Sequence, residues 1–156
     1  MNDVRPPRPT PRERALWHSF FPMEAELWQW LGRRLRADAE LSEADWRVLD
    51  ALGNTAGHRL RAHELAARIA FGKSRLHQHV TRMVGRGLLH REPAPDDGRG
   101  TVVSLTPEGL TRFRRAQHHR ARHIREALLD PLTPDEVDTL VRLAEKVRAH
   151  LRQLGT

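Results

Sequence analysis

The chain has 156 residues, of which 38% are hydrophobic, and this size and composition suit a single domain with a small core. It contains no cysteine, so disulfide scaffolds, thiolate metal sites and thiol nucleophiles are excluded. Its 27 basic and 20 acidic residues give a formal net charge of +7, which favours a polyanionic partner such as nucleic acid.

The positive charge is concentrated in the middle of the chain. Residues 59–92 carry eight basic and two acidic side chains, whereas residues 1–58 carry eight and nine. A genome-wide bias toward arginine would spread the excess evenly, so the clustering indicates an electrostatic surface for a nucleic acid.

The first eleven residues contain four prolines and are predicted to form a mobile tail rich in proline and arginine, residues 1–11. They lack the apolar centre of a signal peptide, and no later run approaches the roughly 18 apolar residues of a membrane span. We therefore expect a cytoplasmic protein that does not contact membranes.

A long amphipathic helix is predicted over residues 12–40, because apolar residues recur there every three or four positions. Pro22 lies inside the pattern, and since an interior proline removes a backbone hydrogen bond, we expect a kink or a new helix start there. The apolar stripe consists of Leu16, Phe20, Met23, Leu27 and Trp30 or Leu31.

Three shorter helices are predicted next. The first follows the N-cap residue Ser42, the second covers residues 63–70, and the third covers residues 73–86. The last two are joined by a brief turn and therefore form a candidate helix-turn-helix. Their inward faces are predicted to consist of Trp46, Leu49 and Leu52 in the first helix and of Leu76, Val80, Met83 and Val84 in the third.

The pattern then changes to that of a β-hairpin. Residues 88–92 and 101–106 are predicted to be its strands, joined by a long loop rich in proline and aspartate. Arg99 lies between two glycines at the tip of this loop.

Two further helices are predicted over residues 107–129 and 134–154, and in each a proline occupies the first helical position. The apolar residues of the last helix recur at alternating intervals of three and four, as in a coiled-coil seam. We expect this seam to pack with the stripe of the first helix, and a symmetric dimer is favoured. The candidate dimerisation residues are Leu16, Phe20, Leu128, Leu140, Val147 and Leu151.

This order predicts a mainly α-helical protein with a small β-hairpin wing, namely a winged helix-turn-helix flanked by dimerisation helices. In three segments the chain resembles the multiple-antibiotic-resistance regulator (MarR) family, and the likeness extends over about residues 12–154. The segments are LSEADWRVLDAL at residues 41–52, HELAARIAFGKSRLHQHVTRMVGRGLLHRE at residues 63–92, and DDGRGTVVSLTPEG at residues 96–109.

The resemblance implies three ordered parts: an N-terminal dimerisation helix at residues 12–40, a DNA-binding lobe at residues 41–106, and C-terminal helices that complete the dimerisation region at residues 107–154. It further implies a homodimeric transcriptional regulator that binds a pseudo-palindromic operator in double-stranded DNA. Repression is the expected outcome, and release by a small ligand is a hypothesis. Because Gly72, Arg75, His77 and Ala94 depart from the family pattern, the operator sequence does not transfer from relatives.

The helix over residues 73–86 is the candidate for reading DNA, because a helix fits the major groove and the side chains opposite its core face are polar. Arginine can bind guanine and glutamine can bind adenine through two hydrogen bonds each, although an ordinary solvated face is the alternative interpretation. The candidate residues on this helix are Lys73, Ser74, Arg75, His77, Gln78, Thr81 and Arg82.

Arg99 at the wing tip suits the narrow minor groove, whose negative potential attracts arginine. The resemblance implies that Asp97 holds this arginine in place; a plain turn is the alternative interpretation. His77 is expected to face DNA and to tighten binding when protonated, whereas His79 is expected to pack at the edge of the helix.

The resemblance also implies an effector pocket between the dimerisation helices and the DNA-binding lobe. Trp17, Phe20, Trp46 and Phe113 are the candidate lining residues, with an ordinary aromatic core as the favoured alternative. His119 and His123 have the i, i+4 spacing of a metal site, but no third ligand lies near them in sequence. A solvated face rich in histidine is therefore favoured, with no metal and no cofactor, and a metal-responsive regulator is kept as an alternative.

Two other classes of function are less consistent with the sequence. A nonspecific architectural DNA-binding protein is compatible with the arginine content, but Arg75 and Gln78 favour base readout. An enzyme is disfavoured, because the sequence contains neither a phosphate-binding loop nor a nucleophile motif.

Overall fold

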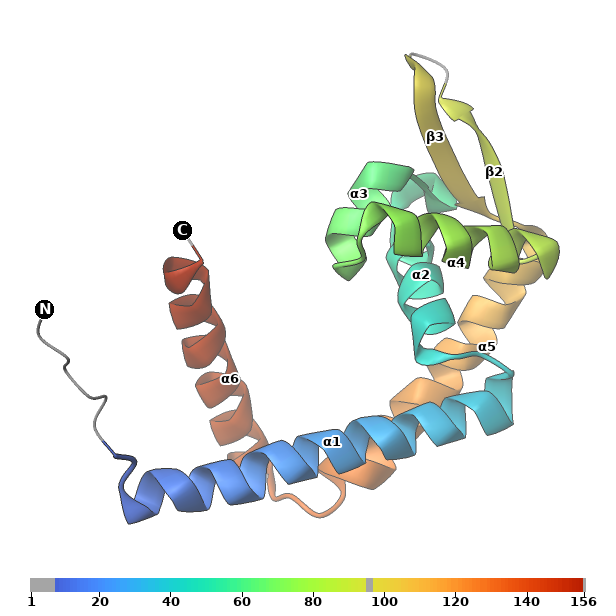
Figure 1. The fold of residues 1–156 in the computed structure, drawn as a ribbon. Helices are drawn as coiled ribbons and strands as arrows, with labels where there is room; N and C mark the ends of the chain where they lie inside the picture. The colour runs from blue at the N-terminus through green and yellow to red at the C-terminus, as the bar shows by residue number, and fades with distance from the viewer. Residues whose placement is uncertain (1–7, 95–96, 156) are drawn as a thin grey trace, which may run out of the picture.

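The computed structural model describes residues 8–94 and 97–155, with the backbone alone at residues 97–99. It is mostly helical with one small sheet, as Figure 1 shows. The elements in chain order are α1 (Pro11–Ala39), α2 (Glu43–Gly53), a short 3-10 turn (Ala56–His58), β1 (Arg59–Arg61), α3 (Ala62–Ile69), α4 (Lys73–Gly85), β2 (Leu89–Ala94), β3 (Asp97–Leu105), α5 (Pro107–Ile124), a π-helical turn (Arg125–Leu129) and α6 (Pro134–Leu154).

The sheet has three antiparallel strands in the order β1-β3-β2, one more strand than the hairpin expected from the sequence. In β1, Leu60 pairs with Val103 of β3. β1 has only three residues, which are too few to show an alternation of apolar and polar side chains in the sequence. The predicted long loop is also wrong, because β2 and β3 extend to within two residues of each other. Pro93 is tolerated because β2 is an edge strand and its register shifts there.

α1 runs as one helix through Pro22, so the expected new start is wrong. The proline is exposed and removes a single backbone hydrogen bond, which a helix of 29 residues tolerates. A capping box formed by Thr10 and Glu13 fixes its beginning, and Glu40 ends it in the left-handed conformation.

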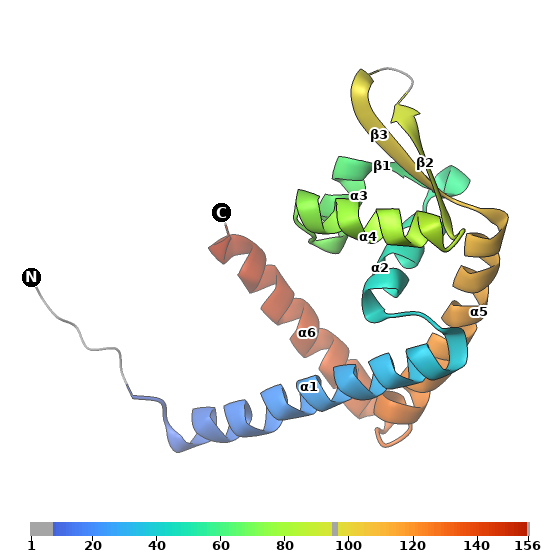
Figure 2. The same ribbon diagram turned by 45° about the vertical axis from the view of Figure 1, so that its right-hand side comes forward.

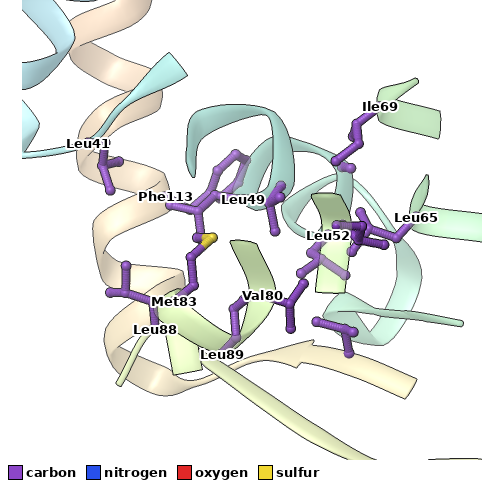
Figure 3. Packing of buried hydrophobic residues seen from close by; sticks show 14 of the residues in the cluster. Leu41, Leu49, Leu52, Leu65, Ile69, Val80, Met83, Leu88, Leu89 and Phe113 are labelled. Carbon is purple, nitrogen blue, oxygen red and sulfur yellow. The ribbon is translucent and has the colours of Figure 1, made fainter. Parts of the chain in front are cut away.

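The core lies in the lobe formed by α2, α3, α4 and the sheet, where Figure 3 shows the side chains converging. α5 contributes Phe113, whose ring occupies the space beside Gly53, so that a Cβ there would collide with it. Of the expected inward residues, Trp46 is only half-buried and Val84 is exposed. The largest fully buried side chains include Leu35, Leu41, Leu49, Leu52, Leu65, Met83 and Leu89.

The N-terminal half of α1 and the whole of α6 extend away from this lobe, as Figures 1 and 2 show from two directions. No residue of α6 is buried, so the two terminal helices do not form a packed pair within the described part of one chain. Their large exposed apolar side chains include Leu16, Trp17, Phe20, Phe21, Leu140, Val147 and Leu151, while Leu128 in the π-helical turn is half-buried. In the described ranges, no helix combines the length and apolarity needed to cross a membrane.

Candidate nucleic-acid interface

The turn between α3 and α4 fixes the angle at which α4 leaves the lobe. Ala70 adopts a left-handed conformation, and the backbone N–H of Phe71 donates to the carbonyl oxygen of Ala66 at 3.0 Å. The ring of Phe71 is buried and anchors the turn in the core. α4 then buries Leu76, Val80 and Met83, as expected from their spacing.

The opposite face of α4 is exposed and polar. Thr81 donates its hydroxyl to the carbonyl oxygen of His77 at 2.9 Å, so this hydroxyl already has a partner within the helix. His79 is the exception to the polar exposed pattern and is buried, in agreement with its expected position at the helix edge. The seven candidate residues, Lys73, Ser74, Arg75, His77, Gln78, Thr81 and Arg82, are all exposed on this helix.

A groove separates α4 from the wing formed by β2 and β3, and its volume is 1150 Å³. Lys73, His77 and Gln78 line it from α4, and Arg91 lines it from β2. Glu92 also lines the groove, and its carboxylate lies 3.8 Å from the guanidinium of Arg59. Arg91 was not among the predicted site residues; the signal that could have found it is its place in the basic segment, on the strand leading to the wing tip.

The predicted contacts of the wing tip lie outside the described side chains. Asp97 and Arg99 begin β3, and the structure describes their backbone alone. Their roles at the minor groove therefore stay predictions.

Arg75 has a defined position at the start of α4. Its guanidinium lies over the ring of Phe71, 4.1 Å from the ring centre, in a cation–π contact. The buried ring of Phe71 thus holds Arg75 close to the α3–α4 turn, on the solvent-exposed N-terminal part of α4.

A buried carboxylate joins α4 to α2. Asp45 accepts a hydrogen bond from Arg86 at 2.9 Å, and one of its oxygens lies 3.1 Å from Nε2 of His79. It also accepts from the backbone N–H of Ser42 at the start of α2. Burial alone would raise the pKa of the Asp45 carboxyl, but the hydrogen bonds from Arg86 and Ser42 outweigh this effect and lower it.

The four candidate pocket residues are not gathered in one place. Trp46 and Phe113 are stacked, with ring centres 5.8 Å apart. Trp17 and Phe20 lie on the exposed first half of α1, and no ring contact joins them to Trp46 among the described residues. The guanidinium of Arg120 lies over Trp46, 5.9 Å from the ring centre.

Arg120 is buried between the aromatic side chains of α1 and α2. Its guanidinium makes two hydrogen bonds to the carboxylate of Glu43, at 2.8 and 3.1 Å, and lies over Trp28 at 5.5 Å. This bidentate pair connects α5 to the beginning of α2. Arg120 could not be singled out from the sequence, because the same helix carries several other arginines that are exposed.

The expected solvated histidine face is wrong for His123, which is 1% exposed. Its Nε2 lies 2.7 Å from Oδ2 of Asp38 on α1, and its ring meets the edge of Trp30. Burial lowers the pKa of the neighbouring His119. Among the described residues no group of three potential metal ligands has a geometry suited to an ion, so the metal-responsive alternative gains no support.

Comparison with known proteins decides the family. A model of the MarR family matches residues 40–100. The multiple antibiotic resistance protein MarR of Salmonella typhimurium is 34% identical over 68 residues, which are 44% of this chain and 47% of that protein. The HTH-type transcriptional repressor IacR of Pseudomonas putida is 32% identical over 124 residues, which are 78% of this chain and 71% of IacR. The chain belongs to the MarR family.

A solved MarR-family structure shows the same fold. Sco3205, a MarR family transcriptional regulator from Streptomyces coelicolor solved in complex with DNA, matches with a TM-score of 0.86 and 32% identity, over 94% of this chain and 92% of Sco3205. The expected winged helix-turn-helix is thereby confirmed, with α4 as its second helix and β2–β3 as its wing. The match to the Salmonella MarR protein spans about half of that protein's length.

Proposed function

We propose that this MarR-family chain is a sequence-specific regulator that binds a pseudo-palindromic operator as a homodimer and represses transcription. The observation that carries the proposal is the exposed face of α4, where side chains able to read base edges border a groove to which Lys73 and Arg91 contribute basic groups. DNA binding by Sco3205, which shares the fold, supports the same use of this face. We also propose that the protein acts in the cytoplasm. We propose no catalytic activity for it.

The proposed homodimer would use the exposed apolar faces of α1 and α6. A narrow apolar seam on α6 and the apolar first half of α1 have no partner among the described residues of one chain. A two-fold arrangement would bury both faces and would place the two α4 helices on successive turns of the duplex, roughly 34–36 Å apart. The lobe at residues 41–106 would then read each half-site.

Release by a small ligand is part of the proposal. The stacked rings of Trp46 and Phe113, beside the pair of buried Arg120 and half-buried Glu43, offer an apolar wall and a polar group between α1, α2 and α5. A ligand that binds there would act by changing the spacing of the recognition helices, because a rigid operator detects that spacing. Trp17 and Phe20 would belong to the dimer interface.

The test is fluorescence anisotropy of the purified protein at about 150 mM salt, where nonspecific affinity is weak. Duplex DNA from upstream of the protein's own gene is compared with a shuffled duplex, and selection from random DNA follows if neither binds tightly. Preferential binding by about 10³-fold or more supports a specific regulator. Equal affinity for native, selected and shuffled duplexes would instead support the architectural alternative.

Two substitutions test which residues read the operator. Gln78→Ala is expected to relax the preference at one base position, because a glutamine can contact a single adenine through two hydrogen bonds. Arg99→Ala is expected to weaken binding to all sequences, because a minor-groove arginine responds mainly to potential. Affinities for a set of single-base operator variants distinguish the two outcomes. Unchanged specific binding in both variants would contradict the assignment of helix and wing.

A further inference from the structure

The ring of His79 lies between the buried carboxylate of Asp45 and an arginine of the DNA-facing side of α4. Its Nε2 is 3.1 Å from Oδ1 of Asp45, and its Nδ1 is 3.2 Å from Nη2 of Arg82. His79 is 7% exposed, whereas Arg82 is exposed. A chain of contacts thus runs from the N-terminus of α2, through the lobe, to the proposed DNA surface.

Both partners of the ring require the same tautomer. A carboxylate can only accept, so Nε2, the nitrogen near Asp45, must carry the proton; a guanidinium can only donate, so Nδ1 must be the acceptor for Arg82. The ring N–H does not point at the Asp45 oxygen, so Nε2 lies close to the carboxylate but has no hydrogen-bond partner among the described residues. The neutral Nε2–H form of His79 is the one that is compatible with both neighbours.

The charges around the ring favour this neutral form. The other oxygen of Asp45 is already occupied by Arg86 and by the backbone N–H of Ser42. From α4 and its C-cap the ring faces Arg82 and Arg86, and from the α3–α4 turn it faces the edge of Phe71. Burial, aided by the two arginines, lowers the pKa of His79 despite the attraction of Asp45.

We propose that His79 is a positioning residue for Arg82, whose guanidinium its neutral ring holds ready for DNA and releases when Nδ1 is protonated. Arg82 donates one N–H to the ring and keeps its other N–H groups for a phosphate or a base. A held arginine loses less conformational freedom on binding than a free one. The inference rests on the proposed DNA-binding role of Arg82.

The tautomer is tested without DNA. Long-range nitrogen–proton correlation spectra of the uniformly ¹⁵N-labelled full chain distinguish the two neutral tautomers and the charged ring. We expect the Nε2–H form at neutral pH and protonation of His79 only below its ordinary pKa of 6.5. An Nδ1–H tautomer, or a charged ring at pH 7, would overturn the inference.

The functional link is tested by a double-mutant cycle on operator affinity. His79→Gln places an amide where Nε2 meets Asp45 but offers no acceptor near Nδ1, so it should cost about threefold to tenfold in affinity when Arg82 is present. In the Arg82→Ala background the same change should cost less than about twofold. His79→Asn, which places an acceptor near the position of Nδ1, should recover part of the affinity.

Lys73→Ala is the matched control, because Lys73 is also exposed on α4 and lines the groove, but lies six positions before His79. Its effect should add to that of His79→Gln. The difference in affinity between wild type and Arg82→Ala should also shrink as pH falls through the pKa of His79. Both proteins keep His77, so the contribution of that exposed histidine cancels in the comparison.

The outcomes separate the inference from the proposed function. If Arg82→Ala weakens operator binding but its effect simply adds to that of His79→Gln, the positioning role is wrong and the DNA-binding role of Arg82 stands. If Arg82→Ala leaves operator binding unchanged, both are wrong for this residue. Circular dichroism of each variant detects loss of the fold, in which case the tautomer spectra of the wild-type protein decide.

Discussion

At the residue scale, Asp45 joins three parts of the lobe through one carboxylate. It caps α2 by accepting from the backbone of Ser42, pairs with Arg86 beyond the end of α4, and contacts His79. Arg86 in turn donates to the carbonyl oxygen of Glu40 at 3.0 Å, so the end of α1 belongs to the same network. A buried charge with this many partners is costly to remove, because the partners lose their compensation together.

Asp45→Asn is expected to lower the free energy of unfolding by about 2–3 kcal/mol, since it weakens a cap and a charged hydrogen bond of a buried group. Urea denaturation at pH 7 measures the loss. Because the folded pKa of Asp45 lies below its ordinary value of 3.8, its contribution is present above that value and disappears as pH falls through the folded pKa. The variant should therefore show a smaller acid-induced loss of stability.

Asp138→Asn is the control for this prediction, because Asp138 is exposed on α6. Its effect should stay within about 0.5 kcal/mol. Equal stability of the Asp45 and Asp138 variants would show that the buried network does not hold the lobe together.

The candidate DNA-facing residues of α4 could be predicted from the sequence because a single helix presents them. Once Leu76, Val80 and Met83 define the inner face, the opposite face follows from the helical period. The partners of Asp45 could not be predicted, because Arg86 lies 41 positions away and only tertiary packing brings it near. In the sequence, Asp45 is only one of two acids that closely follow the N-cap residue Ser42, which is a local property.

At the element scale, the wing is attached to α5 by a close contact at Gly109. Thr106 caps α5 through the backbone N–H of Gly109 at 2.8 Å and donates its hydroxyl to the carbonyl oxygen of Gly87. The Cβ of any other residue at position 109 would collide with the backbone carbonyl of Leu88, which leads into β2. The glycine therefore allows helix and strand to approach, and the wing depends on it for its direction.

Gly109→Ala is expected to destabilise the protein by about 1–3 kcal/mol, because the colliding group is backbone and cannot rotate away. Gly32→Ala is the matched control in a helix: nothing lies within 4 Å of its added Cβ. That change should stabilise by about 0.5–1 kcal/mol through helix propensity. Thermal unfolding of the two variants gives the comparison, and similar midpoints would contradict the close contact at Gly109.

Helices were predicted better than strands for a physical reason. The periodic apolar residues of α3 and α4 and the proline-led start of α5 are local signals, and each produced an element close to the expected bounds. β1 exists only because β3 offers it a partner, as Leu60 faces Val103. Such a strand of three residues has no pattern of its own that could predict it.

At the scale of the whole molecule, α6 extends from the lobe with an apolar seam that the described residues of one chain leave uncovered. Replacing both Val147 and Leu151 by Asp is expected to convert the proposed dimer to a monomer, because four charges per dimer would have to be buried. Sedimentation velocity measures the mass. Specific operator binding should be lost with the dimer, since each half-site alone lacks the effective concentration that a linked second site supplies.

Thr139→Asp is the control, because Thr139 is exposed on α6 outside the seam and the change adds the same type of side chain, one per chain in place of two. This variant should remain dimeric and bind DNA as before. If the double variant at Val147 and Leu151 remains dimeric, the dimer interface lies elsewhere on the molecule.

The dimer also determines how a single groove residue affects the salt dependence of binding. Arg91 lines the groove between α4 and the wing, and a two-fold complex would present it to the duplex twice. Each lost phosphate contact reduces the slope of log affinity against log salt concentration by about 0.9, so Arg91→Ala should reduce it by about 1.8.

Arg33→Ala is the control, because Arg33 is an exposed arginine on α1, away from the wing, and its loss should leave the slope unchanged. Titrations between about 50 and 200 mM salt provide the slopes. A reduction of half the expected size would mean that only one copy contacts the phosphates, and no reduction would remove Arg91 from the DNA-binding surface.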